Sequence, residues 1–306
     1  MLFNYAICTP IYNKNSAGVC VLHKLANELN VQGRKCIIIF MVKKNDGYNL
    51  FYYHEKNKVN ESYFNKNFKY FFIKQDELKS FLNNSIVIYP EVITDNPLNA
   101  KYICRYMLNK EGAIIKNKKI NFLKNDFILS HSKNYHKKFN FLLFFDILDP
   151  NLPIMDNQYA SQLRKIDATY IGKGSKDEDC KVIENTIEIT RSWPNNKIEL
   201  YKVLSNVRYF YTYDNFSLLN LEAIICGCIP IFLSKKAAPD LIMNDYDITF
   251  PDKHFKIPSL QDNFHDLKKI RKKILNKLIT FHDDYPKKVN LFINKIEDHF
   301  LKLNND

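Results

Sequence analysis

The 306-residue chain contains no long hydrophobic run. The apolar stretch Phe139–Leu148 is too short to cross the hydrocarbon core of a bilayer and includes Asp146. The N-terminus also lacks the basic region and apolar run that mark a signal peptide. We therefore expect a protein without a membrane-spanning segment, located in the cytoplasm or peripherally at the inner face of the cytoplasmic membrane.

The cysteines lack any metal-ligand spacing. Of seven cysteines, Cys226 and Cys228 are separated by one residue, and no second pair follows. An odd number of cysteines without a signal peptide favours a reducing compartment. Two Asp-x-Asp sequences, Asp177–Asp179 and Asp245–Asp247, do not lie in a setting that suggests a metal-bound diphosphate. We expect neither a metal nor a cofactor.

Motifs for nucleic-acid recognition are also missing: there is no zinc-finger spacing, RNA-binding signature or basic zipper. The formal net charge is nevertheless +12, which predicts attraction to anions such as nucleotide phosphates, an anionic membrane surface or nucleic acid. The basic clusters are dispersed, as a solvated surface would have them. A nucleic acid is therefore not the partner we expect, and the oligomeric state stays open.

Length and composition favour two globular domains. The chain is about twice as long as a typical domain, and 46% of its residues are hydrophobic. Pro150 and Pro153 mark a linker between the halves. The expected divisions are a first domain at 1–154, a second at 155–285 and a C-terminal helix at 286–306.

The first half begins with a strand–helix–strand unit, which implies a parallel sheet. A strand at 2–8 precedes a helix that opens at Ser16-Ala17-Gly18 and ends at Gly33, and a second strand covers 35–42. The remaining predictions for this half are an irregular insertion or hairpin at 45–67, a short helix at 76–82, strands at 85–92 and 126–130, and a helix capped by Asp95 or Asn96 that runs from Pro97 to about Asn109.

The second half repeats the alternation of strands and helices. Strands are predicted at 168–171, 186–190, 208–213 and 229–233, and helices at 196–205, from about 217, at 262–281 and from Pro286 to about Leu303. In the helix at 196–205, Ile198, Leu200, Tyr201 and Leu204 are expected to face inward. The fold class is therefore α/β, with two Rossmann-like domains.

The segment from Arg208 to Leu233 carries two acids, Asp214 and Glu222, separated by seven residues. Asp214 ends a predicted strand, and Glu222 lies about one and a half turns inside the helix that follows. Both can face the carboxyl edge of a parallel sheet, where open α/β folds place their ligands. Ionised carboxylates accept several hydrogen bonds, so the pair suits a ligand rich in hydroxyl groups.

This segment resembles the donor-binding core of GT-B glycosyltransferases, in which a Glu, seven residues and a second Glu precede an Ala and then a Gly. Asp214 replaces the first Glu, and Glu222, Ala223 and Gly227 match. The resemblance implies two domains that face a central cleft, with the C-terminal helix crossing back onto the first. It also implies that Asp214 contacts the donor sugar and that Glu222 binds the nucleotide ribose.

The same resemblance implies that Lys173 and Arg191 hold the donor phosphates. Lys173 lies between Gly172 and Gly174, and an alternative is that it is only a turn lysine. Backbone N–H groups at the predicted helix start add phosphate donors. Trp193, the one tryptophan, either stacks on the base or anchors packing. The other residues expected around the donor are Thr212, Asn215, Phe216, Ser217 and Leu218.

Three residues of the first half are candidates for the acceptor side. The resemblance implies that Ser16-Ala17-Gly18 is the small-residue loop that lies near both the donor phosphate and the acceptor. Gly18 permits close approach of a ligand to the backbone there, or simply starts a helix. Glu91 and His131 each follow a predicted strand, where either could orient or deprotonate an acceptor hydroxyl. Each could equally be a structural residue.

Together these features predict a retaining, metal-independent glycosyltransferase. The pieces at 89–112, 172–174 and 189–194 resemble a bacterial subgroup of cell-surface glycan transferases. The resemblance implies a nucleotide-sugar donor as substrate and a surface polysaccharide or lipid-linked glycan as acceptor. Three alternatives remain: a transferase that glycosylates DNA bases, a non-catalytic nucleotide-sugar or glycan-binding module, and a sugar-phosphate epimerase.

Overall fold

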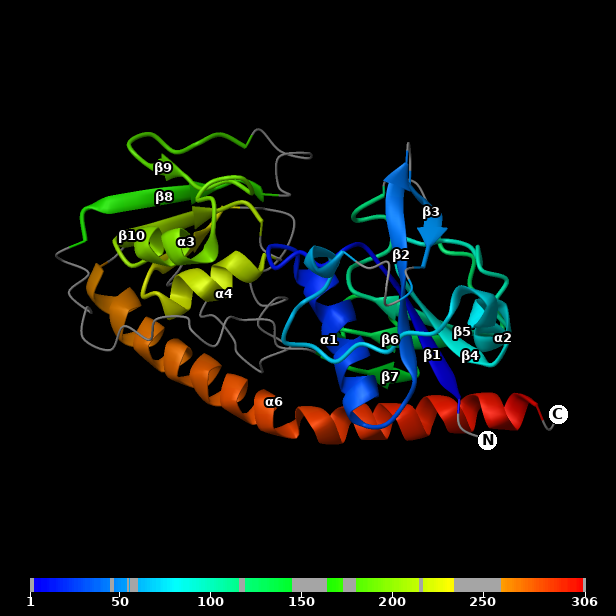
Figure 1. Ribbon diagram of the computed structural model, residues 1–306. Coiled ribbons are helices and arrows are strands. Elements are labelled where there is room, and N and C mark those ends of the chain that lie inside the picture. The colour runs from blue at the N-terminus through cyan, green and yellow to red at the C-terminus, as the bar shows by residue number, and fades with distance from the viewer. Residues whose placement is uncertain are drawn as a thin grey trace. The chain divides into compact units, whose positions relative to one another are not determined.

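The protein consists of two compact units, Met1–Ile147 with Asp283–Asp306, and Leu148–His282. The computed structural model describes residues 3–44, 47–53, 55, 60–115, 119–144, 164–172, 180–214, 217–233 and 260–304 (Figure 1). The first unit holds a seven-stranded sheet in the order β3-β2-β1-β4-β5-β6-β7, and the second a four-stranded sheet in the order β11-β10-β8-β9. The predicted α/β class with parallel sheets is confirmed, and the cleft between the units stays a prediction.

The strands of the first sheet are β1 (Asn4–Thr9), β2 (Cys36–Lys44), β3 (Gly47–Tyr52), β4 (Ser85–Pro90), β5 (Tyr102–Met107), β6 (Phe127–Ser130) and β7 (Phe141–Leu142). All neighbours pair in parallel except β2 and β3, which form the hairpin that was one of two predictions for this region. The carboxyl ends of the parallel strands, which are all except β3, therefore meet at one edge of the sheet.

Both faces of this sheet are covered, because successive strand residues point to opposite sides. Tyr5 and Ile7 of β1 join a core that includes α1 (Ala17–Val31), whereas Ala6 and Cys8 join a core that includes Phe81 of α2 (Leu78–Asn83). A strand buried on both faces reads as a nearly continuous apolar run. This is the pattern of 36–41 and 85–89.

The C-terminal helix α6 (Leu260–Leu303) completes the first core. Two helices were predicted here, but a single helix passes through Pro286. A proline inside a helix costs about 3 kcal/mol, whereas each buried large apolar side chain contributes about 1.5–3 kcal/mol. The apolar stripe that outweighs the proline consists of Tyr285, Val289, Phe292, Ile293, Ile296 and Phe300, all buried in the same core as α1. In Figure 1 the red end of α6 runs along the strands of this unit.

Polar contacts fix the same part of α6. The Tyr5 hydroxyl donates to Glu297 Oε1 at 2.9 Å, and Arg34 forms an ion pair with this carboxylate at 2.9 Å. Gln32 Nε2 donates to the carbonyl of Pro286 at 2.8 Å. Gln32 and Arg34 both follow α1, so the C-terminal end of α1 is bound to α6 at two positions, Pro286 and Glu297.

The predicted helix from Pro97 to Asn109 is wrong: the region forms a turn followed by β5. Asn96 does act as a cap, but of the turn, because its Oδ1 accepts the Ala100 N–H at 2.8 Å and the Tyr89 hydroxyl at 2.9 Å. Asn99 has a positive φ of 49°, which ends any helical path. Residues 103–107 are then buried between β4 and β6, where strand pairing satisfies the backbone.

The strands of the second sheet are β8 (Ile166–Tyr170), β9 (Ile187–Glu188), β10 (Val207–Thr212) and β11 (Ile229–Phe232), all parallel. Its helices include α3 (Lys197–Leu204), capped by Asn196 Oδ1 on the Glu199 N–H at 2.9 Å, and α4 (Leu218–Ile225). Leu200, Tyr201 and Leu204 of α3 are buried as predicted, but Ile198 is 69% exposed. Ile198 lies in the first turn, before the helix reaches its core.

A buried arginine ties the helices of the second unit together. Arg164 donates to the carbonyl of Val207 at 2.8 Å, to that of Leu204, the last residue of α3, at 3.5 Å, and to that of Cys226, just after α4, at 3.0 Å. Gly227 has a φ of +88°, and a Cβ there would lie 2.8 Å from Arg164 Nη2. Glycine thus provides both the backbone conformation and the space that Arg164 needs.

No helix among the described residues is both long enough and apolar enough to pass through a bilayer.

Candidate functional site

The carboxyl edge of the second sheet gathers several predicted donor-site residues. β8 ends at Tyr170 and the neighbouring β10 ends at Thr212, and the Tyr213 N–H donates to the Tyr170 carbonyl at 3.0 Å. The chain after β8 carries Gly172, and the chain after β10 carries Asp214. Adjacent parallel strands therefore deliver both segments to the same place.

Asp214 is 5% exposed, and its backbone is hydrogen-bonded to residues on both sides. Its N–H donates to Thr212 Oγ1 at 3.1 Å, and its carbonyl accepts the Ser217 N–H at 3.2 Å and Asn220 Nδ2 at 2.9 Å. Ser217 also caps α4, because its Oγ accepts the Leu219 N–H at 3.2 Å. The backbone of Asp214 therefore joins the end of β10 to the start of α4 through these hydrogen bonds.

Gly172 packs directly on the Asp214 side chain. Its φ is +56°, and a Cβ there would lie 2.7 Å from Asp214 Oδ2 and 2.6 Å from Tyr170 Cε1. No other residue type fits this position without displacing the carboxylate. The glycine therefore sets how closely the loop after β8 approaches Asp214.

The Tyr170 phenol lies within electrostatic reach of both Asp214 and Arg191. Burial raises the pKa of Tyr170, the Asp214 charge adds to the rise, and hydrogen bonds with Ser217 and Arg191 oppose it. These groups therefore surround one phenol, and Arg191, which is exposed, extends the cluster toward solvent. Tyr170 was not predicted as a site residue. The available signal was a polar aromatic residue at the carboxyl end of a strand.

Glu222 lies on α4, is 1% exposed, and is paired with a lysine that the sequence analysis missed. Lys197 Nζ is 2.5 Å from Glu222 Oε1, and the Tyr201 hydroxyl donates to the same oxygen at 3.3 Å. Lys197 is the first residue of α3, where the helix dipole disfavours a cation. A lysine at the start of a predicted helix therefore indicates that a carboxylate elsewhere in the protein pairs with it, and this was the signal available in the sequence.

The remaining donor-side predictions divide into described and undescribed residues. Lys173, Gly174, Asn215 and Phe216 lie outside the described residues. Leu218 is the first residue of α4. Trp193 is 42% exposed, and its backbone N–H donates to Thr190 Oγ1 at 3.0 Å within a tight turn. Its exposure favours a surface or ligand contact over a packing anchor.

The three predicted acceptor-side residues meet around the end of β5 in the first unit. The Glu91 N–H donates to the Tyr106 carbonyl at 3.1 Å, and Glu91 Oε2 accepts the Leu108 N–H at 3.2 Å. The His131 N–H donates to the Met107 carbonyl at 3.0 Å. A Cβ at Gly18 would lie 3.6 Å from Leu108 Cδ1. Residues from α1 and from the ends of β4 and β6 therefore converge on one point.

His23 fixes the loop between β1 and α1. His23 is fully buried, and burial lowers its pKa to about 4, so the ring is neutral at pH 7. One ring nitrogen, Nε2, lies 3.0 Å from the Pro10 carbonyl, which only accepts, so Nε2 carries the proton. Nδ1 then accepts the Tyr70 hydroxyl at 2.9 Å. The loop that leads to Gly18 is held by this neutral imidazole.

Within the described residues, no group of three or more histidine, cysteine or acidic side chains could hold a metal ion. The two Asp-x-Asp sequences, at 177–179 and 245–247, lie outside the described residues.

No protein-family model matches the chain, and no curated protein does. Similar solved structures include an α-glucosyltransferase with UDP and a DNA 13-mer containing an HMU base, at 12% identity and a TM-score of 0.38, covering 100% of this chain and 99% of the other. Another is an α-glucosyltransferase with UDP, at 13% identity and a TM-score of 0.35, covering 96% of each chain. These similarities are low, and the function proposed below rests on side chains.

Proposed function

We propose that the protein is a glycosyltransferase that moves a sugar from a nucleotide-sugar donor to an acceptor hydroxyl. The observation that supports it is the gathering of Asp214, Arg191 and Tyr170 at the carboxyl edge of the second sheet. Carboxylates there accept hydrogen bonds from sugar hydroxyls, and cations neutralise phosphates. A donor that joins a sugar to a nucleotide through phosphates needs both.

Each residue has a proposed part in the transfer. Asp214 contacts the donor sugar, and Glu222 accepts the ribose hydroxyls. Arg191 and Lys173 neutralise the phosphate that leaves when the bond from the sugar C1 to the phosphate oxygen breaks. Lys197 joins them, because its side chain is 26% exposed while it contacts Glu222. The new bond joins C1 to the acceptor oxygen, whose proton passes to Glu91 or His131. Retention and metal independence are part of the proposal.

The test is a panel of nucleotides and nucleotide sugars, scored first by melting temperature and then by product formation. A ligand at 100 times its Kd stabilises the folded state by about 2.7 kcal/mol, which raises Tm by several degrees. We expect one nucleotide diphosphate and its sugar conjugates to do so, with slow release of the free nucleotide. Failure of the whole panel would contradict the proposal. Binding without turnover would indicate a non-catalytic module, and interconversion of donors an epimerase.

The acceptor proposed first is a bacterial surface polysaccharide or lipid-linked glycan, used by a cytoplasmic protein at an anionic membrane face. The second candidate acceptor is DNA. A basic surface on α6 bears on both: Lys268, Lys269, Lys272 and Lys273 are exposed, and residues 268–280 contain no acid. Such a surface attracts anionic lipids and nucleic acid alike.

Binding assays with anionic vesicles and with duplex DNA separate the two acceptors, and substitution of these four lysines by glutamine tests the part that the surface plays. Each lysine near an anionic surface contributes about 1 kcal/mol to binding. We therefore expect the quadruple variant to bind phosphatidylglycerol vesicles at least 100-fold more weakly, as measured by co-sedimentation. Lys133, Lys137 and Lys138, exposed after β6, provide a control set whose substitution should have a smaller effect. Salt-dependent binding of duplex DNA, with no binding of vesicles, would instead favour the DNA acceptor.

A further inference from the structure

The first unit contains a buried cation that the proposed chemistry does not use. Arg105, on β5, is 1% exposed and is the one buried lysine or arginine among the described residues of this unit. Its strand neighbours are Tyr89 on β4 and Ile128 on β6, and the core on this face is otherwise apolar. Replacing a buried ion pair by apolar residues is often neutral or stabilising. Stability alone therefore does not account for a charge here.

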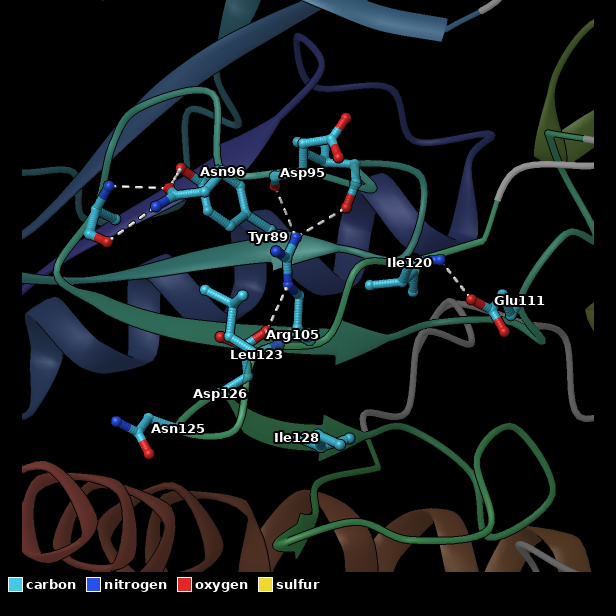
Figure 2. Close-up of polar contacts among 12 residues, drawn as sticks. Tyr89, Asp95, Asn96, Arg105, Glu111, Ile120, Leu123, Asn125, Asp126 and Ile128 are labelled. Atoms are coloured by element: carbon cyan, nitrogen blue, oxygen red, sulfur yellow. Dashed lines mark hydrogen bonds and ion pairs between the residues drawn. The ribbon is translucent and has the colours of Figure 1, made fainter. Parts of the chain in front are cut away.

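The guanidinium group holds the loop that follows β4. Nη1 donates to the carbonyl of Ile93 at 3.0 Å and to that of Asp95 at 2.9 Å, and Nε pairs with Asp126 Oδ2 at 3.2 Å. Figure 2 shows Arg105 pointing from its strand toward Asp95 on one side and the Leu123–Asp126 turn on the other. The loop lacks regular secondary structure, so its inward carbonyls need such donors. The rigid fork of arginine fixes the separation of loop and sheet.

Glu91 begins this loop. Its N–H is held by Tyr106, the residue after Arg105, and its carboxylate by the Leu108 N–H. Two residues further on, the carbonyl of Ile93 accepts the hydrogen bond from Arg105. The position of Glu91 therefore depends on that of the loop. A shift of residues 93–95 would pull the Glu91 carboxylate away from the Leu108 N–H.

We propose that Arg105 is a positioning residue, which places the Glu91 carboxylate at the ends of β4 and β5, where it receives the acceptor proton. This inference rests on the proposed function. A catalytic group displaced by about 1 Å loses about 100-fold in rate. We call the contacts of Arg105 with Ile93, Asp95 and Asp126 the clamp. The clamp gives a reason for burying a charge in an apolar face close to Glu91.

A double-mutant cycle tests the inference. We expect Arg105→Lys, which keeps the charge but loses the fork, to lower the kcat of transfer by about 10- to 100-fold and to leave the donor KM unchanged. Glu91→Gln should lower kcat at least as much, and the double variant should match Glu91→Gln alone. Losses that multiply, or a Glu91→Gln variant with full activity, would overturn the proposal. Neither of these results would contradict nucleotide-sugar binding by the second unit.

Amide hydrogen exchange gives a readout that does not depend on turnover. The Glu91 and Leu108 amides should exchange at least 10-fold faster in Arg105→Lys than in the parent protein, and unchanged rates would overturn the clamp. Tyr89→Phe is the matched control: it removes the hydroxyl that donates to Asn96 and accepts the Leu98 N–H at the far end of the same loop, and both amides should stay protected. If Arg105→Lys does not fold, Arg105→Met combined with Asp126→Asn removes both charges, and the amide oxygen of the new asparagine can still accept the Leu123 N–H. The same increase in exchange at Glu91 and Leu108 is expected in this variant, and unchanged rates would again overturn the proposal.

Discussion

Replacing Glu222 by alanine is expected to weaken nucleotide binding by about 100-fold while the second unit remains folded. A hydrogen bond to a charged group contributes about 1.5–3 kcal/mol, and a ribose offers two hydroxyls, so a loss near 2.7 kcal/mol is reasonable. The fold should tolerate the change because Lys197, with a side chain 26% exposed, reaches water when its partner is removed. Isothermal titration with the nucleotide that emerges from the donor panel measures the effect.

A neighbouring acid provides the control for Glu222. Glu199 is exposed on α3, and its replacement by alanine removes the same charge from the same unit. We expect its affinity for nucleotide to stay within about 2-fold of the parent value, as for most surface substitutions. Equal affinities for the parent and the Glu222→Ala protein would remove Glu222 from the donor site.

Gly227→Ala is expected to destabilise the second unit by about 3 kcal/mol or more. A left-handed backbone costs a non-glycine residue about 1–2 kcal/mol. The added methyl would also lie 2.8 Å from Arg164 Nη2 and would push the guanidinium from the carbonyls that it binds. A buried charge with broken hydrogen bonds adds about 1–3 kcal/mol. Urea denaturation followed by circular dichroism measures the change.

Gly33→Ala separates backbone strain from the loss of the Arg164 contacts. Gly33 has a similar φ of +81°, but nothing lies within 4 Å of a Cβ at that position. We therefore expect a cost of only about 1–2 kcal/mol there. Equal losses for the two glycine variants would show that Arg164 moves freely and does not tie the helices together.

The elements around the two acids were predictable because their signals are local. Asn196 caps a helix, Ser217 caps another, and the apolar runs at 208–213 and 229–233 form strands. The spacing of Asp214 and Glu222 placed one at the end of β10 and the other inside α4. Each of these features is set by a few neighbouring residues.

The errors arose where distant contacts decide the structure. The segment after Pro97 has acceptable helix formers, but a place between β4 and β6 makes it a strand. Pro286 signals a helix start, but burial against the first core carries the helix through it. Lys197 meets Glu222 only because α3 and α4 lie side by side, and Tyr170 meets Arg191 only because loops from separate strands converge. No local pattern records such pairings.

The last helix has a consequence for how the protein is made. Tyr5 bonds Glu297, a partner 292 positions later, and Phe292, Ile296 and Phe300 belong to the core built on the first strands. During synthesis, which proceeds at about 5–20 residues per second, the contacts between that core and α6 form only after the ribosome has released residues near 300. The part of the core that α6 covers is therefore still uncovered when the whole second unit has emerged.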